Sequence, residues 1–563
     1  MRFQILIELA LLLVVGTVMG LVMAIMANGF VEGVSAAANL RASSEYLQFS
    51  VAGTTYSAMA PLILLLAAVI IIILRRTLKL DSWAGPADSI LAAHTDSREL
   101  DIKKGLASTF AAFTSAAGGG SVGQYGPLVH FGATVGSLFQ RVGLTQISGD
   151  VFLGCGVAAA ISAGFNAPLA GVIFAHEAIL RHFSLRAVAP IFIASISASS
   201  FDQQLFPANQ STFQIVANAP PLIQTVPYLI VAGMIFAGIA LSFMLALRYA
   251  AVVGKKIQSK NIEPPLIAAV VCGGFGIFVP EILGIGVDVV NNLFQGGYSI
   301  QYIALILVLK LAITALCIGF GLFGGVFSPA LFIGVSAGAI VSTVLSFSAS
   351  ASLNQVMMIA GMAAVSSSVI GAPIAVILIV LELTGSYEYA VSAMVAVIVS
   401  SLITHRVFGL SYFDRQLKDR GIDMSLGRED IQLSRTYLKN HLSRECIIVE
   451  ASESGSSLSE IMTERQMTEA YVIGRKDVLV GKVDIFGAQQ ARGNPIATEL
   501  IKDPLILKET DSLKTALASI ESFVGESVPI VNDAGEFQGV LTEGMLFSAA
   551  SSVKAAITKL EKE

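Results

Sequence analysis

Long apolar runs dominate residues 1–420 of the chain, and short polar loops separate them. The first run is Ile5–Met26, and later runs include Tyr228–Leu247, Tyr302–Phe320 and Pro329–Phe347. A straight membrane helix needs about 20 apolar residues, and these runs reach or approach that length. The pattern predicts a bundle of membrane helices that begins with Ile5–Met26.

Other apolar runs are too short to cross a bilayer directly, and glycine or proline interrupts many of them. Val151–Ala163, Ala187–Ala198 and Ala372–Leu383 each have only about 12 or 13 residues. Broken helices are tolerated in a membrane only where protein buries them or where they line a cavity. The pattern is therefore typical of a transporter or a channel.

Charge separates this apolar part from the end of the chain. Of the 563 residues, 54% are hydrophobic and only 13% are charged, whereas an average soluble protein has about 25% charged residues. Roughly half of the charged residues fall in the last quarter of the chain, which is net acidic. We expect a membrane domain over residues 1–420 and a soluble domain over residues 431–563. A soluble enzyme and a nucleic-acid binder are excluded for most of the length.

The basic residues cluster in particular loops, which indicates how the chain is oriented. The clusters include Arg75–Lys79, Lys103–Lys104, Lys255–Lys260 and Arg415–Arg420. The positive-inside rule places such loops in the cytoplasm. Because Arg415–Arg420 leads into the soluble part, the tail is predicted to be cytoplasmic.

An internal repeat is the most informative feature of the sequence. Gly118–Gly132 reads GGGSVGQYGPLVHFG, and Gly319–Gly334 reads GFGLFGGVFSPALFIG. Each copy is followed by an Ala-Pro pair and then by a glutamate nine residues after that proline, at Glu177 and at Glu382. Two copies in opposite orientation predict an inverted-repeat transporter fold with its site near the membrane midplane.

The glycine-rich loop of each copy ends in a proline at the start of an apolar helix. Gly123–Pro127 and Gly324–Pro329 have this form. A helix N-terminus carries unpaired N–H groups and a partial positive charge, so two of them would bind a small anion without Lys or Arg. For each glycine taken singly, close helix packing stays open as the alternative.

These motifs resemble those of the CLC family of chloride channels and chloride/proton exchangers, over about residues 1–420. The family's GxxGPxxxxG loop is similar to Gly123–Pro127, its GxFxP loop to Gly325–Pro329, and its late tyrosine to Tyr412. The resemblance implies a homodimer in the lipid bilayer, with one anion pathway in each subunit.

The resemblance also implies which residues surround the central anion. They would be Gly126, Gly325, the backbone amides of Val326 and Phe327, and the hydroxyl group of Tyr412. For Tyr412, an aromatic anchor at the membrane interface is the alternative.

The first loop departs from the family pattern at Tyr125. The family usually has a glutamate there, which blocks the outer anion site and moves on protonation. A phenol has an ordinary pKa of about 10, so it stays neutral and donates a hydrogen bond, but it cannot carry protons as a carboxylate does. We expect Tyr125 to be a gate or a lining residue; a packed aromatic side chain is the alternative.

The second proton-path position of the family is also changed. Exchangers of the family end the corresponding helix with two glutamates, which here would be Glu177 and Ala178. The inner proton acceptor is thus absent, and Glu177 has a counterpart in Glu382 that assigns it to the repeated scaffold. Glu177 and His176 remain candidates for a substitute path. An HExxH zinc motif would need histidine at position 180, which is Leu180.

The third departure lies where the family has GSGIP, whose serine contacts the central anion. Pro86 aligns with that serine. Proline at this place goes with nitrate preference in the family, and it offers neither a hydroxyl nor an N–H group. We expect Pro86 to line the anion site, with chloride, nitrate and bicarbonate as candidate anions. The alternative is that Pro86 only begins a cytoplasmic helix.

The tail has a strand–helix–strand–strand–helix pattern twice, over about residues 440–492 and 498–552. It resembles a tandem CBS pair, on the evidence of Gly481–Asp484 and Gly539–Thr542. Nucleotide-binding pairs have Ser or Thr followed three residues later by Asp, but here Asp484 takes the Thr place and Met545 the Asp place. An adenine nucleotide would use Asp484 and Thr542; packing and dimerisation are the alternative.

Together these observations predict an all-α polytopic membrane domain of the inverted-repeat CLC type, with halves at about 1–200 and 220–415. A cytoplasmic α/β tandem CBS domain follows. We expect a homodimeric voltage-gated-type chloride channel or uncoupled transporter that passes chloride or a similar monovalent anion. The alternatives are an anion/proton exchanger with a non-standard proton path and a CBS-linked membrane sensor without ion flux. We expect no enzyme activity, no metal, no obligatory cofactor and no nucleic-acid partner.

Overall fold

The fold is described from a computed structural model that covers most of the chain. The described residues are 2–43, 48–51, 54–95, 100–142, 149–183, 185–206, 221–345, 351–424, 428–521, 523 and 525–562. The chain divides into two compact units, Met1–Arg420 and Gly421–Glu563. We call them the membrane unit and the tail unit, and each is described by itself.

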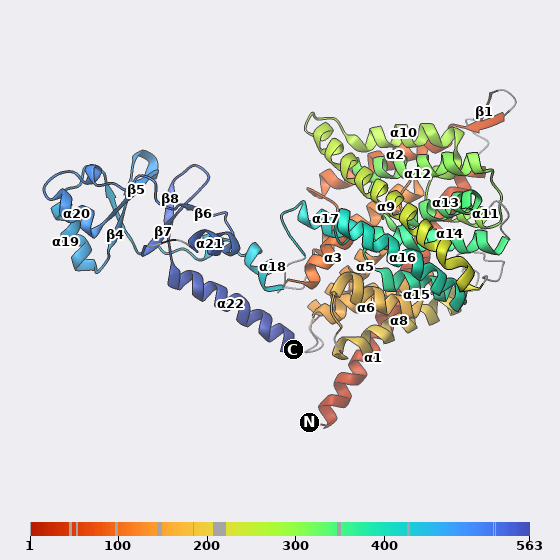
Figure 1. The fold of residues 1–563 in the computed structure, drawn as a ribbon, viewed down its shortest axis with the longest axis horizontal. Helices are drawn as coiled ribbons and strands as arrows, with labels where there is room; N and C mark the ends of the chain where they lie inside the picture. The colour runs from red at the N-terminus through yellow and green to blue at the C-terminus, as the bar shows by residue number, and fades with distance from the viewer. Residues whose placement is uncertain are drawn as a thin grey trace. The chain divides into compact units, whose positions relative to one another are not determined.

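The membrane unit is a helical bundle (Figure 1). Its helices are α1 (Arg2–Ser43), α2 (Met59–Thr77), α3 (Pro86–Ala93), α4 (Ile102–Ala117), α5 (Tyr125–Arg141), α6 (Gly149–Phe165), α7 (Pro168–Phe174), η1 (Ala175–Leu180, a π-helix), α8 (Leu185–Leu205), α9 (Leu222–Gln258), α10 (Pro264–Phe278), η3 (Pro280–Ile282), α11 (Val287–Phe294), α12 (Ile300–Gly319), α13 (Phe327–Leu345), α14 (Ala351–Ile370), α15 (Pro373–Thr384), α16 (Tyr387–Val407) and α17 (Tyr412–Lys418). One antiparallel hairpin joins β1 (Gln48–Val51) to β2 (Thr54–Ser57). Within the described ranges, seven helices have the length and composition to span a membrane.

The first helix is longer than the apolar run Ile5–Met26 predicted. Helix α1 has 42 residues and continues to Ser43. The continuation is rich in alanine and contains Gly33, where a Cβ atom would lie 2.7 Å from the Phe113 ring. Because small residues let α1 pack closely against α4, the helix stays ordered past its most apolar part.

The two repeat copies build the same helix pair, α5 with α6 and α13 with α14. A Cβ atom on Gly132 would lie 2.2 Å from the Gly156 carbonyl oxygen, and one on Gly334 would lie 2.3 Å from the Gly361 oxygen. Backbone therefore packs on backbone in both pairs, which only glycine permits. The matched glycines of the repeat, Gly132 and Gly334, are thus helix-packing positions.

The glutamates of the repeat cap helices of the opposite copy. The carboxylate of Glu177 accepts hydrogen bonds from the N–H groups of Ile374 and Ala375, at 3.0 and 2.7 Å, where α15 begins. In the same way, Glu382 accepts two bonds of 2.9 and 2.8 Å from the first turn of α7. A carboxylate at a helix N-terminus satisfies unpaired N–H groups and favours the helix dipole. We call these two contacts the reciprocal caps.

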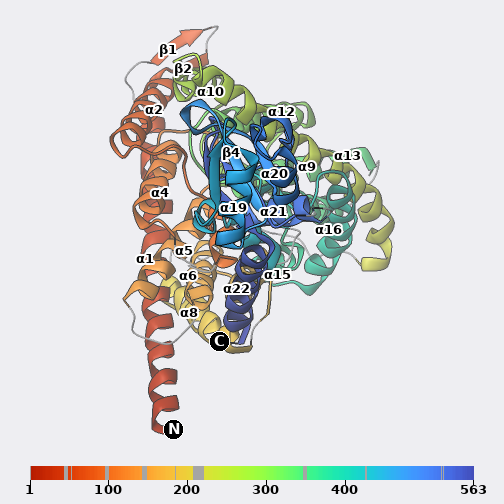
Figure 2. The same cartoon turned by 90° about the vertical axis from the view of Figure 1, so that its left-hand side faces the viewer.

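The tail unit contains two small sheets of the same topology, seen from a second side in Figure 2. In each, a parallel strand pair is followed by an antiparallel pair, in the orders β3-β4-β5 and β6-β7-β8. The elements are α18 (Arg428–Arg435), η4 (Leu438–Asn440), β3 (Ile447–Glu450), α19 (Gly455–Arg465), β4 (Glu469–Ile473), η5 (Arg475–Asp477), β5 (Leu479–Asp484), α20 (Ile485–Ala491), η6 (Ile496–Thr498), β6 (Leu507–Lys508), α21 (Leu513–Ile520), β7 (Ser527–Val531), β8 (Phe537–Thr542) and α22 (Glu543–Lys562). These elements follow the pattern that the sequence predicts twice.

Polar contacts join the two halves of the tail unit. The Tyr471 hydroxyl on β4 donates to the Ser527 carbonyl on β7 at 2.9 Å, and burial raises the pKa of this phenol above its ordinary value. Beside it, the Lys482 ammonium pairs with the Glu469 carboxylate at 2.7 Å, and both side chains are about nine-tenths buried. Buried polar groups that all have partners therefore hold the two halves together.

Candidate functional site

The glycine-rich loops of the two repeats meet at a backbone bridge between Gly123 and Gly325. Each N–H group donates to the carbonyl oxygen of the other residue, at 2.7 and 2.6 Å. A Cβ atom on Gly123 would lie 2.8 Å from the Gly325 oxygen, and one on Gly325 would lie 2.8 Å from the Gly126 nitrogen. Glycine is therefore required at both positions. We call this contact the glycine bridge.

A cavity of about 70 Å³ lies beside the glycine bridge. Its lining includes Pro86, Gly126, Gly325, Val326 and Tyr412, so the structure gathers five of the sequence-predicted residues around one space. We call this space the Tyr412 cavity. The sixth residue, Phe327, begins α13 next to this lining but is itself only 3% exposed.

Four helices begin at the Tyr412 cavity, and Tyr412 itself is the first residue of the short helix α17. Pro86 is the first residue of α3, Gly126 lies in the first turn of α5, and Val326 directly precedes α13. Their first-turn N–H groups have no acceptor inside the helices, and each N-terminus carries a partial positive charge. A small anion in the cavity would be stabilised by these groups and by the Tyr412 hydroxyl.

The charged side chains at this cavity neutralise each other. The Arg420 guanidinium bonds to the Asp88 carboxylate at 2.8 Å, and the same carboxylate accepts the Gly85 N–H at 2.8 Å. Asp88 thereby caps α3 while its charge is balanced. The local positive potential for an anion therefore comes from the helix ends.

Tyr125 is part of an aromatic cluster rather than of the Tyr412 cavity. Its ring stacks on Phe165 with centroids 3.7 Å apart, and it meets Phe327 edge-on at 5.7 Å. Phe165 and Phe327 lie 5.3 Å apart, and all three side chains are nearly fully buried. We call these three rings the aromatic cluster.

A second cavity, of about 530 Å³, lies on the other side of Tyr125 in chain order. Gln124 lines this cavity, whereas Gly126 lines the Tyr412 cavity. Its other lining residues include Arg41 at the end of α1 and Ala60 at the start of α2. We call it the Arg41 cavity.

The two cavities lie near opposite ends of helix α2. Ala60 at its start lines the Arg41 cavity, and Trp83, which follows its end, lines the Tyr412 cavity. A helix of 19 residues is about 28 Å long, close to the thickness of the hydrocarbon core of a bilayer. Gln124 and Gly126, the chain neighbours of Tyr125, therefore line two cavities that lie near opposite ends of this helix.

The residues at the family's inner proton-path position lie in and beside η1. Glu177 forms one of the reciprocal caps, and Ala178 is buried against neighbouring helices. His176 is 1% exposed; its Nδ1 atom lies 2.9 Å from the His182 carbonyl oxygen. Within the described ranges its Nε2 atom has no hydrogen-bond partner.

The two candidate nucleotide residues of the tail unit have matching local roles. The Asp484 carboxylate accepts the Gly487 N–H at 2.7 Å at the start of α20. The Thr542 hydroxyl oxygen accepts the Met545 N–H at 3.2 Å at the start of α22. Both side chains act as helix caps, which explains why small polar residues stand there.

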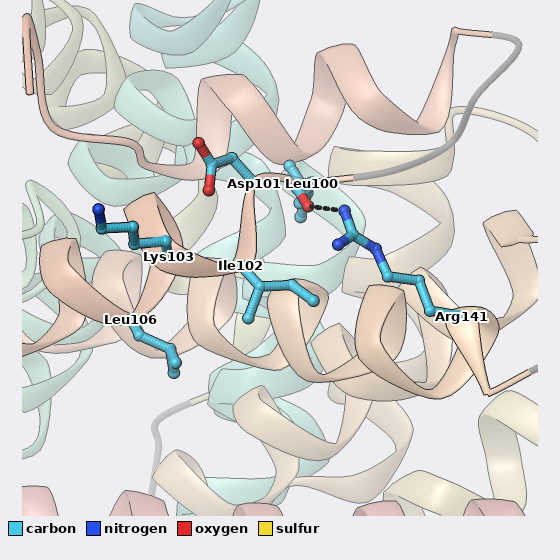
Figure 3. Close-up of a pocket in the computed structure, with 6 residues that line it drawn as sticks. All are labelled: Leu100, Asp101, Ile102, Lys103, Leu106 and Arg141. Atoms are coloured by element: carbon cyan, nitrogen blue, oxygen red, sulfur yellow. Dashed lines mark hydrogen bonds between the residues drawn. The ribbon is translucent and has the colours of Figure 1, made fainter.

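A third cavity lies apart from both others, at the start of α4 (Figure 3). Lys103 and Arg141 line it, and the Arg141 guanidinium donates to the Leu100 carbonyl at 3.1 Å. None of the sequence-predicted site residues contributes to this lining. Among the residues that the structure describes, no group of three or more His, Cys, Asp or Glu side chains is arranged to hold a metal.

The sequence did not point to Phe165, Gln124, Arg41 or the Asp88–Arg420 pair. One signal was available for the aromatic cluster, because Tyr125 and Phe327 occupy equivalent places in the repeat. If equivalent glycines pair across the bridge, equivalent aromatic residues two positions later should also meet. The remaining residues lie far apart in the chain and carry no periodic signal.

Comparisons with known proteins agree with this architecture. Residues 63–405 match the model of the family described as "Voltage gated chloride channel". A ClcB-like protein of Ralstonia nicotianae is 28% identical over 59% of this chain and 79% of its own length. The voltage-gated ClC-type chloride channel ClcB of Escherichia coli O17:K52:H18 is 25% identical over 57% of this chain and 77% of its own.

Solved structures of the same type share the fold. A slow cyanobacterial Cl⁻/H⁺ antiporter superposes with a TM-score of 0.62 and 20% identity, over 73% of this chain and 97% of its own. A eukaryotic CLC transporter superposes with a TM-score of 0.62 and 15% identity, over 95% of this chain and 98% of its own.

Proposed function

The chain belongs to the voltage-gated chloride channel family, a family of anion channels and transporters, and from this premise we propose that it conducts anions passively, without proton coupling. The observation that carries the proposal is the buried aromatic cluster around Tyr125. In place of a titratable carboxylate, a neutral phenol stands between Gln124 and Gly126, which line different cavities. A neutral ring can block the pathway and move aside, but it does not carry protons as a carboxylate does. This supports passive flux.

In the proposed pathway, an anion rests in the Tyr412 cavity among the N-termini of α3, α5 and α13. The amides of Val326 and Phe327 and the Tyr412 hydroxyl donate to it, and no protein charge competes there because Asp88 is paired with Arg420. The anion leaves when the Tyr125 ring moves off Phe165. The backbone need not move, since the glycine bridge holds both loops.

Proton coupling lacks its usual carriers in this proposal. Tyr125 keeps its proton at neutral pH, Ala178 has no ionisable group, and the Glu177 carboxylate is occupied as a cap. A second candidate function is anion/proton exchange by way of His176. It is favoured by the buried Nε2 atom of His176, which has no partner among the described residues.

Anion preference is proposed from the lining of the Tyr412 cavity. Pro86 begins α3 and contributes a ring to the lining where a hydroxyl would add a donor. We expect chloride and nitrate to pass with similar ease, and bicarbonate to be a candidate. A flux series over chloride, nitrate, bicarbonate and fluoride, repeated with Pro86→Ser, measures the contribution of this one position.

The tail unit is proposed to be a cytoplasmic tandem CBS domain that helps a homodimer form. Its twice-repeated strand order supports the CBS assignment, and the likeness to the eukaryotic CLC transporter extends beyond the membrane unit. For the membrane unit, the equivalent residues Leu169 and Ile374 on α7 and α15 are about half exposed and offer an apolar dimer face. A membrane sensor without ion flux is the remaining alternative.

The test is flux through the purified protein in liposomes. Chloride efflux that neither moves protons nor responds to a pH gradient is the expected result for the wild type. Tyr125→Ala should raise the flux several-fold, whereas Tyr125→Phe, which keeps the ring, should leave it near the wild-type rate. Uphill proton uptake driven by chloride would overturn passive conduction. Equal flux in all three proteins would remove the gate role of Tyr125.

A further inference from the structure

The cavity at the start of α4, which we call the Arg141 cavity, combines two cations with apolar side chains. Its volume is about 740 Å³, which is usual for a ligand pocket. Lys103 lies in the first turn of α4 and Arg141 is the last residue of α5; in the view of Figure 3 they flank Ile102. Leu106, one turn further along α4, contributes a second apolar side chain. A ligand in this cavity would meet positive charge and hydrocarbon together.

Hydrogen bonds fix the wall that carries Arg141. Its guanidinium donates to the Leu100 carbonyl oxygen at 3.1 Å, and the Leu100 N–H group donates to the Ser137 hydroxyl oxygen at 3.0 Å. Ser137 and Arg141 are one turn apart on α5, so two bonds hold the segment before α4 against the end of α5. The cation is therefore positioned before a ligand arrives, and a planar guanidinium suits a phosphate group.

The Arg141 cavity lies at the membrane face where α2 ends. The Lys104 ammonium group donates to the Ser82 hydroxyl oxygen at 3.2 Å, and the Ala84 N–H group donates to the Ser108 hydroxyl oxygen at 2.9 Å. Ser82 and Ala84 follow α2, so the start of α4 lies at the same face as the basic cluster Arg75–Lys79. The positive-inside rule predicts that this face is cytoplasmic, and the cytoplasmic leaflet is the one rich in anionic lipids.

The described lining of the cavity has a net positive charge. Its carboxylate, that of Asp101, accepts the Lys104 N–H group at 3.0 Å as the cap of α4. At the same membrane face, Arg75 pairs with the Glu263 carboxylate at 3.1 Å, whereas the described carboxylates include no ion-pair partner for Lys103. Two cations and one carboxylate favour an anionic ligand.

Apolar side chains lead from the cavity towards the middle of the membrane. Leu106 and Phe110 are one turn apart on the same face of α4, and both are about half exposed. On α5, Leu138 lies one turn before Arg141 and is also about half exposed. In a membrane, these exposed side chains would contact the acyl chains of a lipid whose headgroup lies in the cavity.

We propose that the Arg141 cavity binds the headgroup of an anionic phospholipid, with Lys103 and Arg141 on its phosphate and an acyl chain along Leu106 and Phe110. Basic pockets between membrane helices recognise anionic headgroups in this way. The inference goes beyond the proposed function and does not depend on it, since the described linings of the Tyr412 and Arg41 cavities contain none of these four residues.

The first test is lipid binding by native mass spectrometry on the full-length protein in detergent. The wild type should bind phosphatidylglycerol at least about fivefold more tightly than phosphatidylcholine, which has no net charge. Lys103→Gln and Arg141→Gln should each raise the Kd for phosphatidylglycerol by about fivefold, the contribution of one basic residue near an anionic surface. Equal affinity of the wild type for the two lipids would overturn the proposal.

Lys104→Gln is the matched control, because it removes the same charge one residue away, from a side chain that bonds to Ser82. Its Kd should stay within about twofold of the wild-type value. An equal loss of affinity in Lys103→Gln and Lys104→Gln would indicate a diffuse basic surface and would overturn the site. Because the bond to Leu100 comes from Arg141, Lys103→Gln tests the site even where Arg141→Gln disturbs the segment before α4.

The second test separates a lipid from a free anion by competition. Inorganic phosphate and glycerophosphoglycerol, the deacylated headgroup, should fail to displace phosphatidylglycerol when each is in molar excess. Displacement by either compound would show that the cavity takes a free anion without acyl chains, and would overturn the lipid assignment.

Hydrogen–deuterium exchange in nanodiscs locates the bound lipid. The first turn of α4 and the last turn of α5 should exchange more slowly in discs that contain phosphatidylglycerol than in discs of phosphatidylcholine alone. The wild type and Lys104→Gln should show this protection, and Lys103→Gln should lose it. Protection confined to other helices would place the lipid elsewhere and overturn the site.

Discussion

The two repeats of the membrane unit share a skeleton and differ in what it carries. Each repeat contributes one glycine to the glycine bridge, one helix pair that packs backbone on backbone, and one of the reciprocal caps. In contrast, the residue that precedes the equivalent aromatic residue, Tyr125 or Phe327, is Gln124 in the first copy and Val326 in the second. Each of these lines a different cavity, one polar and one apolar at that place.

The aromatic residues likewise occupy equivalent positions in the two copies but have different neighbours. Tyr125 and Phe327 are equivalent in the repeat and touch each other, but Tyr125 also stacks on Phe165. The equivalent of Phe165 in the second copy is Ile370, which has no ring to stack. The shared skeleton therefore builds the site, and in our proposal the few asymmetric side chains would place a gate on one repeat only.

The largest effect should come from breaking the shared skeleton at the glycine bridge. Gly325→Ala places a Cβ atom 2.8 Å from the Gly126 nitrogen and 3.0 Å from the Pro127 ring, and neither can move aside. We expect liposome flux to fall more than about tenfold and the free energy of unfolding to fall by about 1–3 kcal/mol. Gly238→Ala on α9 is the control, because none of the described residues outside its own helix turn lies within 4 Å of its Cβ position. Wild-type flux in Gly325→Ala would contradict the bridge as a structural requirement.

An intermediate effect should come from removing the asymmetry of the aromatic cluster. Phe165→Leu makes the first copy resemble the second and removes a stacked pair worth about 0.5–1.5 kcal/mol, so the closed position of Tyr125 is less favoured. We expect chloride efflux to rise by up to about tenfold. The matched change Ile370→Leu should leave efflux unchanged. If both variants behave alike, the stack on Phe165 does not hold the gate.

The smallest effect on transport should come from the reciprocal caps. Glu177→Ala and Glu382→Ala each remove two hydrogen bonds from a helix N-terminus, which costs about 0.5–2 kcal/mol of stability. Thermal unfolding followed by fluorescence should show equal losses, and chloride flux per folded protein should not change. Each variant is the control for the other. A change in proton movement in Glu177→Ala alone would instead support the exchanger.

The sequence predicts the parts of this molecule that leave a repeated or periodic signal. The helix runs, the matched glycines Gly132 and Gly334 and the matched glutamates Glu177 and Glu382 are all visible in the amino-acid sequence alone. The twofold strand–helix–strand–strand–helix pattern of the tail is also visible, and the strands β3–β5 and β6–β8 follow it. In each case local physics decides: apolar length, close helix packing or a strand bounded by turns.

The features that the sequence does not predict depend on contacts between distant segments. Arg41 bonds to the Ala117 carbonyl across 76 positions of the chain, and Arg420 pairs with Asp88 across 332. A single charged residue at a helix end has many available partners, so its position in the chain cannot select one. The predicted length of α1 is wrong for a related reason, because its extension is stabilised by packing on α4.

The glycine bridge also has a consequence for how the protein is made. The ribosome adds about 5–20 residues per second, so Gly325 emerges on the order of ten seconds or more after Gly123. During that interval the first loop has no bridge partner, and the Tyr412 cavity lacks Gly325, Val326 and Tyr412 from its lining. A partly synthesised chain in the membrane therefore has no continuous anion pathway. A chain that stalls before its second half is inserted would not dissipate ion gradients.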